Sequence, residues 1–223
     1  MLYESDSYEA MRSLNQELSF TTAQSIFRTN NLEFAASKYF ALGLRNIKDN
    51  QFTNLALLIS EQCLHSIKVA VFEDNENTKF QAHREFTGSI FQQLENAFAF
   101  LMLCNQNPSN FSGLTRNDNW DYPEAAIREA LLNAIIHRDY SYSGSIIINV
   151  NKQAIEFISL GGLLPGLSLE DIKLGISQPR NAKLAEIFHR LKFIESYGTG
   201  IRRIFALYKD CYVKPKITVT QHA

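Results

Sequence analysis

The spacing of apolar positions along the chain changes character near residue 64. Up to that point apolar residues recur at mixed intervals of three and four, which is typical of amphipathic helices. The helical runs are residues 9–29, which a turn divides, 32–48 and 54–63. The pattern therefore predicts a small all-helical region over residues 1–64, with a linking or packing role.

Residues 65–223 alternate between β-rich and helical runs. The β-rich runs, bounded by turn-forming residues, are residues 67–72, 80–86, 145–150, 154–159 and 216–220. The helical runs are residues 88–104, 124–137, 169–174, 182–191 and 201–208, and a polar loop is expected over residues 105–121. This order predicts an α/β (α+β) fold, a two-layer sandwich. In it, a mixed sheet that includes the hairpin beginning at Ile67 is covered on one face by helices.

The overall composition excludes several classes of function. Lysine and arginine number 22 and aspartate and glutamate 23, so the formal net charge of -1 indicates no nucleic-acid or membrane surface. The three cysteines are widely spaced and fit neither a disulfide framework nor a zinc site. No run approaches the roughly 20 apolar residues of a membrane helix. We expect a soluble, cytoplasmic protein without a membrane partner.

One helical run, residues 124–137, carries a polar stripe on an otherwise apolar surface. Glu129, Asn133 and His137 follow one another at intervals of four, so they share one face of the helix. A carboxylate and a carboxamide among Ala, Leu and Ile cost on the order of several kcal/mol of desolvation unless a partner compensates. That partner is either a ligand phosphate with its hydrated metal ion or the backbone of the core, and the helix pattern leaves both open.

Two glycine-containing segments are further candidates for a ligand site. Gly198-Thr199-Gly200 runs directly into a helix, and such a turn lets backbone amides approach a phosphate. Ser159 ends a strand and is followed by Gly161 and Gly162, which leaves a side chain at a sheet edge where ligands often bind. The first segment is also compatible with an ordinary tight turn, and the second with an ordinary strand end.

Charged residues near these segments have two interpretations each. His137, Arg138 and Asp139 are catalytic candidates, or they satisfy the terminal carbonyls of the helix. Arg180, Asn181 and Lys183 reach a ligand phosphate, or Asn181 is a solvated helix cap. The sequence leaves both choices open.

The order of these elements resembles the GHKL, or Bergerat-fold, ATPase family, which includes histidine kinases, anti-sigma-factor kinases and gyrase. The N-box of that family has the form E-x-x-x-N, as Glu129-Ala-Leu-Leu-Asn133 does, and Gly198-Thr199-Gly200 is similar to its glycine box. The resemblance implies ATP and Mg²⁺ as cofactors, Glu129 as the catalytic base and Asn133 as the metal ligand. It implies nucleotide contacts from Asn133, His137, Ser159, Gly161, Gly162, Arg180, Gly198, Thr199 and Gly200.

Further segments narrow the resemblance to RecG-related, Schlafen AlbA-type transcriptional regulators. They are Tyr122-Pro123, Arg128-Glu129-Ala130-Leu131, His137-Arg138-Asp139-Tyr140-Ser141, Arg180-Asn181 and Gly198-Thr199-Gly200-Ile201. Such proteins place a DNA-associated, AlbA-like domain before this region, so we expect a fragment whose DNA contacts lie in domains outside it. In one departure, Ser159 occupies the place of the family's adenine-reading aspartate, and a hydroxyl lacks the charge-assisted bond of a carboxylate.

Three functions are compatible with the sequence. We favour an ATP-binding regulatory module of a DNA-associated transcriptional regulator, in which the nucleotide acts as a conformational switch. The second is a Mg²⁺-dependent ATPase or protein kinase that uses Glu129 as its base. The third is a degenerate interaction module that binds no nucleotide, and a homodimer stays open for all three. Residues 1–60 hold five basic and six acidic side chains, so charge does not favour DNA binding by the helical region itself.

Overall fold

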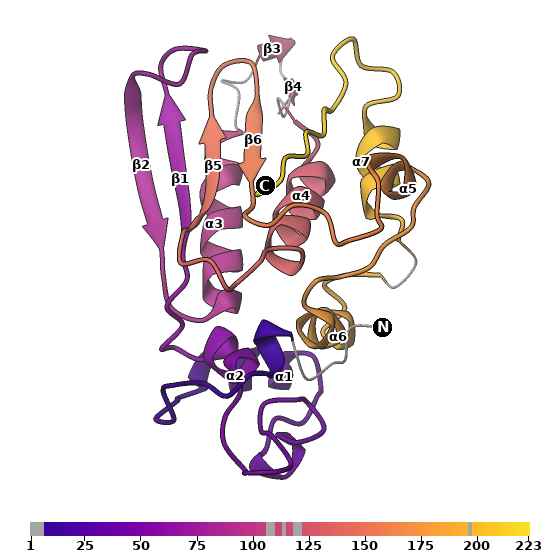
Figure 1. Cartoon of the computed structure of the whole chain (residues 1–223). Helices are drawn as coiled ribbons and strands as arrows, with labels where there is room; N and C mark the ends of the chain where they lie inside the picture. Colours follow the sequence, from indigo (N-terminus) through magenta and orange to yellow (C-terminus); the bar gives the residue numbers. More distant parts are fainter. Residues whose placement is uncertain (1–6, 106–109, 113–114, 118–121, 196–197) are drawn as a thin grey trace.

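Four strands form the main sheet of the protein. The computed structural model describes residues 7–105, 110–112, 115–117, 122–195 and 198–223. The sheet order is β2-β1-β5-β6, with β1 at Ile67–Phe72, β2 at Phe80–Phe86, β5 at Ile146–Val150 and β6 at Ile155–Ile158. β1 pairs antiparallel with β2 and parallel with β5, and β5 pairs antiparallel with β6. The predicted mixed sheet, with the hairpin from Ile67 in it, is confirmed (Figure 1).

One face of this sheet is buried and the other is open. Ile67 and Ile146 are paired in register and buried, whereas the next pair, Lys68 and Ile147, is exposed, because side chains alternate along a strand. Helices α3 (Ile90–Cys104) and α4 (Glu124–Ile136) pack on the buried face. The two-layer sandwich predicted from the sequence is therefore present (Figure 1).

Three further helices lie beyond α4 and bring the carboxyl-terminal third of the chain alongside it. They are α5 (Leu169–Lys173), α6 (Ala182–Arg190) and α7 (Gly200–Leu207), close to their predicted positions. α4 contacts α7, and α5 contacts α7 (Figure 1). Among the described residues, no helix is long and apolar enough to cross a membrane.

The amino-terminal part is less helical than its pattern predicts. Its described residues, from 7 on, form the α-helices α1 (Thr21–Thr29) and α2 (Asn54–Ile59), with 3₁₀ turns at Tyr8–Ala10 and Ala36–Lys38. The predicted helix over residues 32–48 is wrong, because left-handed backbone at Asn31 and Gly43 bounds a series of turns. The aromatic residues of this segment pack against one another instead, in the cluster Phe20, Phe34, Tyr39 and Phe52.

The amino-terminal part is joined to α6 by a buried carboxylate. Glu9, which is 3% exposed, accepts hydrogen bonds from the backbone N–H groups of Lys183 (2.8 Å) and Leu184 (3.0 Å). It thereby satisfies two of the free donors in the first turn of α6. One continuous hydrophobic core includes residues of both parts, while the division of the chain at residue 64 stays a prediction.

Two further sequence predictions differ from the structure. The predicted loop over residues 105–121 contains a small antiparallel pair, β3 (Asn110–Ser112) with β4 (Thr115–Asn117). The predicted strand over residues 216–220 is absent, because this segment joins no ladder. It passes beside the end of β6 instead, where His222 O accepts a hydrogen bond from the Gly161 N–H (2.8 Å).

Candidate functional site

The polar stripe of α4 is held together by hydrogen bonds of its own. Asn133 Nδ2 donates to Glu129 Oε1 (3.1 Å) and to the Glu129 carbonyl (2.8 Å). Glu129, Asn133 and His137 are half-buried, while most of the residues between them lie in the core. The stripe is therefore partly accessible and does not lie inside the core. The Asn133 Oδ1 atom has no hydrogen-bond partner among the described residues.

Gly200 begins α7 directly against this stripe. A β-carbon at residue 200 would overlap Glu129 Oε1 and lie 3.4 Å from Asn133 Nδ2. Gly198 has a left-handed backbone (φ 62°), and a β-carbon there would overlap the Gly175 carbonyl. The turn is therefore more than a connection between helices, because the absence of side chains at Gly198 and Gly200 lets it contact both α4 and the segment that follows α5.

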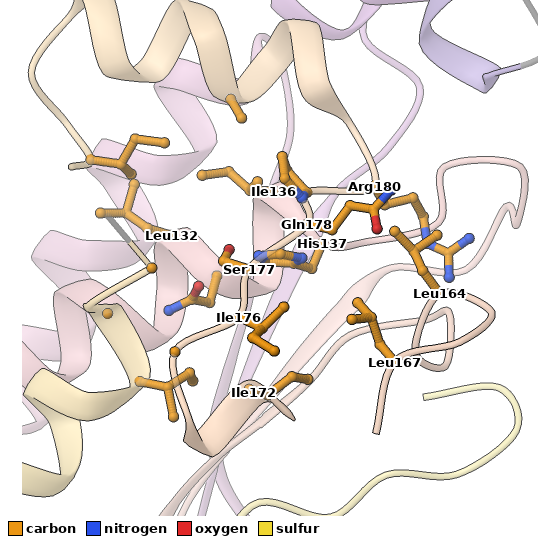
Figure 2. A pocket seen from close by; sticks show the side chains of 18 of the residues that line it. Leu132, Ile136, His137, Leu164, Leu167, Ile172, Ile176, Ser177, Gln178 and Arg180 are labelled. Atoms are coloured by element: carbon orange, nitrogen blue, oxygen red, sulfur yellow. The ribbon is translucent and has the colours of Figure 1, made fainter. Parts of the chain in front are cut away.

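A cavity of about 780 Å³ lies where these elements meet. Glu129, Asn133 and His137 line it from α4, and Gly198, Thr199 and Gly200 line it from the turn. Figure 2 shows apolar side chains from both sides: Leu132 and Ile136 of α4, with Leu164, Leu167, Ile172 and Ile176 of the segment before α6. Its volume and its few polar groups among apolar walls are typical of a small-molecule site.

Two predicted residues, Gly161 and Gly162, line the cavity. Gly161 (φ 104°) lies against the Asp139 backbone, and Gly162 lies against Thr220 of the carboxyl-terminal segment. A β-carbon would come within 2.7 Å of Asp139 Cβ at the first and 2.6 Å of Thr220 O at the second. Close packing thus explains both glycines.

Ser159 is placed differently from these glycines. Its hydroxyl donates to the Ala134 carbonyl of α4 (2.7 Å). The residue is absent from the cavity lining. The structure gives it a role in joining β6 to α4.

Arg180 lines the cavity and is held in place by two partners. Its Nη1 atom lies 3.2 Å from Asp139 Oδ2, and its Nη2 atom donates to the Gly162 carbonyl (2.7 Å). The neighbouring Asn181 is no solvated cap, because it is 2% exposed and donates to the Ile136 and Arg138 carbonyls (both 2.8 Å). Asn181 therefore fixes the start of α6 to the end of α4.

Of the three charged candidates at the end of α4, only His137 lines the cavity. Burial, and then the nearby charge of Arg180, lowers the pKa of the His137 imidazole. Arg138 is 1% exposed and donates to the Tyr142 carbonyl (3.1 Å) and to the Gly144 carbonyl. It thus fixes the chain after α4 and makes no contact with the cavity.

The donor set fits a magnesium ion that is shared with a ligand. No group of three or more His, Cys, Asp or Glu side chains among the described residues could hold a metal ion. Mg²⁺ keeps several waters and needs one or two protein oxygens besides ligand phosphates. Asn133 Oδ1, free of other partners, supplies such an oxygen next to the Glu129 carboxylate.

Several cavity residues were missed by the sequence interpretation. Gly175 follows α5, and no sequence motif marks it. Ile217 and Val219 lie in the segment that was predicted as a strand. All three residues line the cavity. The segment between β6 and α6 carries few periodic positions, so its apolar side chains gave no signal of a site.

Comparison with known proteins supports an ATPase-like domain. Residues 144–222 match the family model described as "Putative ATP-dependent DNA helicase recG C-terminal". The chain carries an ATPase-like domain. Glu129, Asn133 and His137 lie outside the matched residues, and the fold brings Glu129 and Asn133 next to Gly200, which lies within them.

A solved structure shares the fold of most of the chain. The DIP2311 protein from Corynebacterium diphtheriae superposes with a TM-score of 0.77 and 19% sequence identity, over 94% of this chain and 44% of its own. This chain therefore spans less than half the length of that protein. No curated protein matches the chain.

Proposed function

We propose that the cavity binds Mg²⁺-ATP in the manner of the GHKL family. The observation that carries this proposal is the meeting of Glu129 and Asn133 with Gly200 on one wall of a cavity large enough for a nucleotide. The apolar walls suit a base and sugar, and the amides at the start of α7 suit phosphates. Asn133 would hold the ion, which neutralises phosphate charge when bound.

The base would be recognised chiefly by shape and apolar contact. Ser159 takes the place of the family's adenine-reading aspartate, and its hydroxyl is engaged with the Ala134 carbonyl. No charge-assisted bond to the base is available from this position. We therefore expect weaker discrimination between ATP and GTP than an aspartate gives.

We further propose that the nucleotide acts as a switch. The segment between Gly161 and Gly198 forms one side of the cavity and contains α6. Glu9 caps α6 from the amino-terminal part, so a movement of this segment on nucleotide binding is passed to the first residues of the chain. In the RecG-related, Schlafen AlbA-type regulators that the sequence resembles, a DNA-associated domain precedes this point, and DNA contact is assigned to that domain.

An ATPase activity is the second candidate, and the position of Glu129 favours it. The carboxylate lines the cavity next to the glycine turn, where a water beside a terminal phosphate would lie within its reach. A base in that position accepts the proton of the attacking water.

Calorimetric titration with ATP and ADP, each with and without Mg²⁺, tests the proposal. We expect both nucleotides to bind and Mg²⁺ to strengthen ATP binding more than ADP binding. Ile176→Trp fills the cavity and should abolish binding, whereas Ile147→Trp, on the open face of the sheet, should not. Failure of all four titrations at millimolar nucleotide would overturn the proposal.

A further inference from the structure

Strand β2 has one side of its backbone free of partners. It lies at the outer edge of the sheet and, among the described residues, pairs with β1 alone (Figure 1). The Ile146 N–H donates to the Ser66 carbonyl just before β1, so the odd-numbered residues of β1 direct their backbone groups to β2. Their partners on β2 are even-numbered, which leaves the N–H and C=O groups of His83 and Glu85 pointing away from the sheet. Such a row of unpaired groups is a template for another strand.

Helix α3 presents an uncharged stripe to solvent. Gln92, Asn96, Ala99 and Leu103 are all exposed, and Leu103 is 64% exposed. They follow one another at intervals of four, three and four, which is the spacing of the contact seam between two packed helices. A helix face that meets only water usually carries charges. The stripe therefore has the composition of a surface that another helix covers.

The uncharged stripe continues past the free edge of β2. Phe100 of α3 packs on Phe86 of β2, with the ring centroids 5.9 Å apart, so β2 lies on the Phe100 side of the helix. Leu103 is about 60° around the helix from Phe100 in one direction, and the buried Leu101 is about 100° from it in the other. The stripe thus lies on the outer side of β2, opposite the core.

We propose that two copies of the chain associate through these two features. The β2 strand of one copy would lie antiparallel to that of the other, about a twofold axis at His83, and join the two four-stranded sheets into one. Neighbouring strands are about 4.8 Å apart and packed helices about 8–10 Å apart, so the α3 helices beneath the two edges would meet along their stripes. A twofold contact uses the same surface of both copies, as both features here require.

The charges of β2 suit a pair centred on His83. A pair centred on Arg84 or on Glu85 would put two like charges opposite each other, which destabilises a ladder. The centre at His83 puts Ala82 opposite Arg84 of the second copy and Glu85 opposite the uncharged Gln81. The same arrangement covers the uncharged stripe of α3, so a second copy of the chain satisfies both surfaces at once.

This contact is independent of the proposed nucleotide site. Within the described part of the chain, no residue of β2 or α3 lines the cavity of about 780 Å³. β2 lies at one side of the molecule and α7 at the other (Figure 1). The cavity therefore stays open in the dimer, and either proposal can fail without the other.

Sedimentation velocity over a series of protein concentrations tests the dimer at about pH 8, where imidazole is neutral. We expect a reversible equilibrium of monomer and dimer in the wild-type chain. His83→Pro removes one outward donor from each copy and keeps the ladder with β1, so it should weaken dimerisation about 30-fold. Leu103→Glu brings two carboxylates together and should weaken it about tenfold or more. The matched control is Leu174→Glu, which is 65% exposed and outside both elements, and it should change nothing.

The rate of disulfide formation tests the register. The chain used has serine at Cys104 and Cys211, and Cys63 is buried. His83→Cys places two thiols opposite each other at the twofold axis, at a Cα separation that a disulfide spans. Glu85→Cys places them about 13 Å apart along the strands. We expect the first variant to form a covalent dimer at least about tenfold faster than the second.

The other outcomes contradict the proposal. A wild-type chain that stays monomeric at about 0.1 mM would overturn it and assign the free edge to a strand of another protein. A dimer that either His83→Pro or Leu103→Glu leaves at full strength would place the interface elsewhere. Equal oxidation of the two cysteine variants would refute the pairing at His83. Circular dichroism checks that His83→Pro folds, and if it does not, Leu103→Glu and the cysteine variants decide the question.

Discussion

The Glu129 carboxylate and the Gly200 backbone occupy adjoining space, and a β-carbon at residue 200 would overlap Glu129 Oε1. Two segments that are distant in the sequence meet here on one wall of the large cavity. Glycine at residue 200 lets the backbone lie against the Glu129 carboxylate without displacing it, and its own φ lies outside the left-handed region. The contact can be tested by changing either residue.

Gly200→Ala should destabilise the protein through this overlap. We expect the free energy of unfolding to fall by about 1 kcal/mol, the low end for an inserted methyl group, because the Glu129 carboxylate is the flexible end of its side chain and can move partly aside. Denaturant unfolding measures the loss. Glu129→Ala removes the overlapping atoms, so the double variant should be more stable than the sum of the two single losses predicts. Simple additivity would contradict the contact.

Asn133→Ala should show whether Asn133 is a metal ligand or a structural residue. We expect Mg²⁺-ATP binding to weaken about tenfold and metal-free ADP binding less than about threefold, because the lost oxygen would contact the ion and not the base. Calorimetry measures both affinities. Asn149→Ala, on β5 away from the cavity, is the matched control. Equal weakening for the two ligands would show that Asn133 supports the fold alone.

Glu129→Gln distinguishes a switch from an enzyme. If the chain is an ATPase, the substitution should keep nucleotide affinity within a few fold and lower turnover by roughly 10²-fold or more, the size expected for a lost general base. If it is a switch, wild-type turnover is already near background and the variant changes little. Phosphate release in single-turnover reactions measures the rate. We expect the switch, and rapid Glu129-dependent hydrolysis would overturn that expectation.

Acid should destabilise the protein through His65. The His65 Nδ1 atom lies 3.1 Å from Arg138 Nη2, and burial, then the Arg138 charge, lowers the pKa of His65 from 6.5 to about 4. The unfolded chain therefore binds the proton more readily. The contribution of His65 to stability is complete above pH 6.5 and is lost as the pH falls toward 4. We expect this loss to be on the order of 2–3 kcal/mol.

The difference between two pH curves isolates that contribution. Denaturant unfolding of wild type and His65→Gln from pH 7 downward should give curves that converge in acid, because the variant has no imidazole to protonate. His83→Gln, on the exposed strand β2, is the control and should follow wild type. Parallel curves for wild type and His65→Gln would refute the assignment.

The sequence predicted those parts of the site that lie within one element. The stripe of α4 follows from a four-residue spacing alone, and the sheet follows from alternation within short strands. The approach of Gly198 to Gly175 depends on packing between elements that no local pattern encodes. The helix prediction for residues 32–48 was wrong for a related reason. The apolar residues of this segment pack in an aromatic cluster and not on a helix face.

The cap that Glu9 provides for α6 also bears on the order of events during synthesis. Glu9 and Lys183 are 174 residues apart in the chain, and contacts of such long range close late in folding. During synthesis Glu9 stays without these backbone partners until Lys183 and Leu184 have been made. The wall of the large cavity that contains α6 therefore lacks its Glu9 cap until both ends of this contact have been translated.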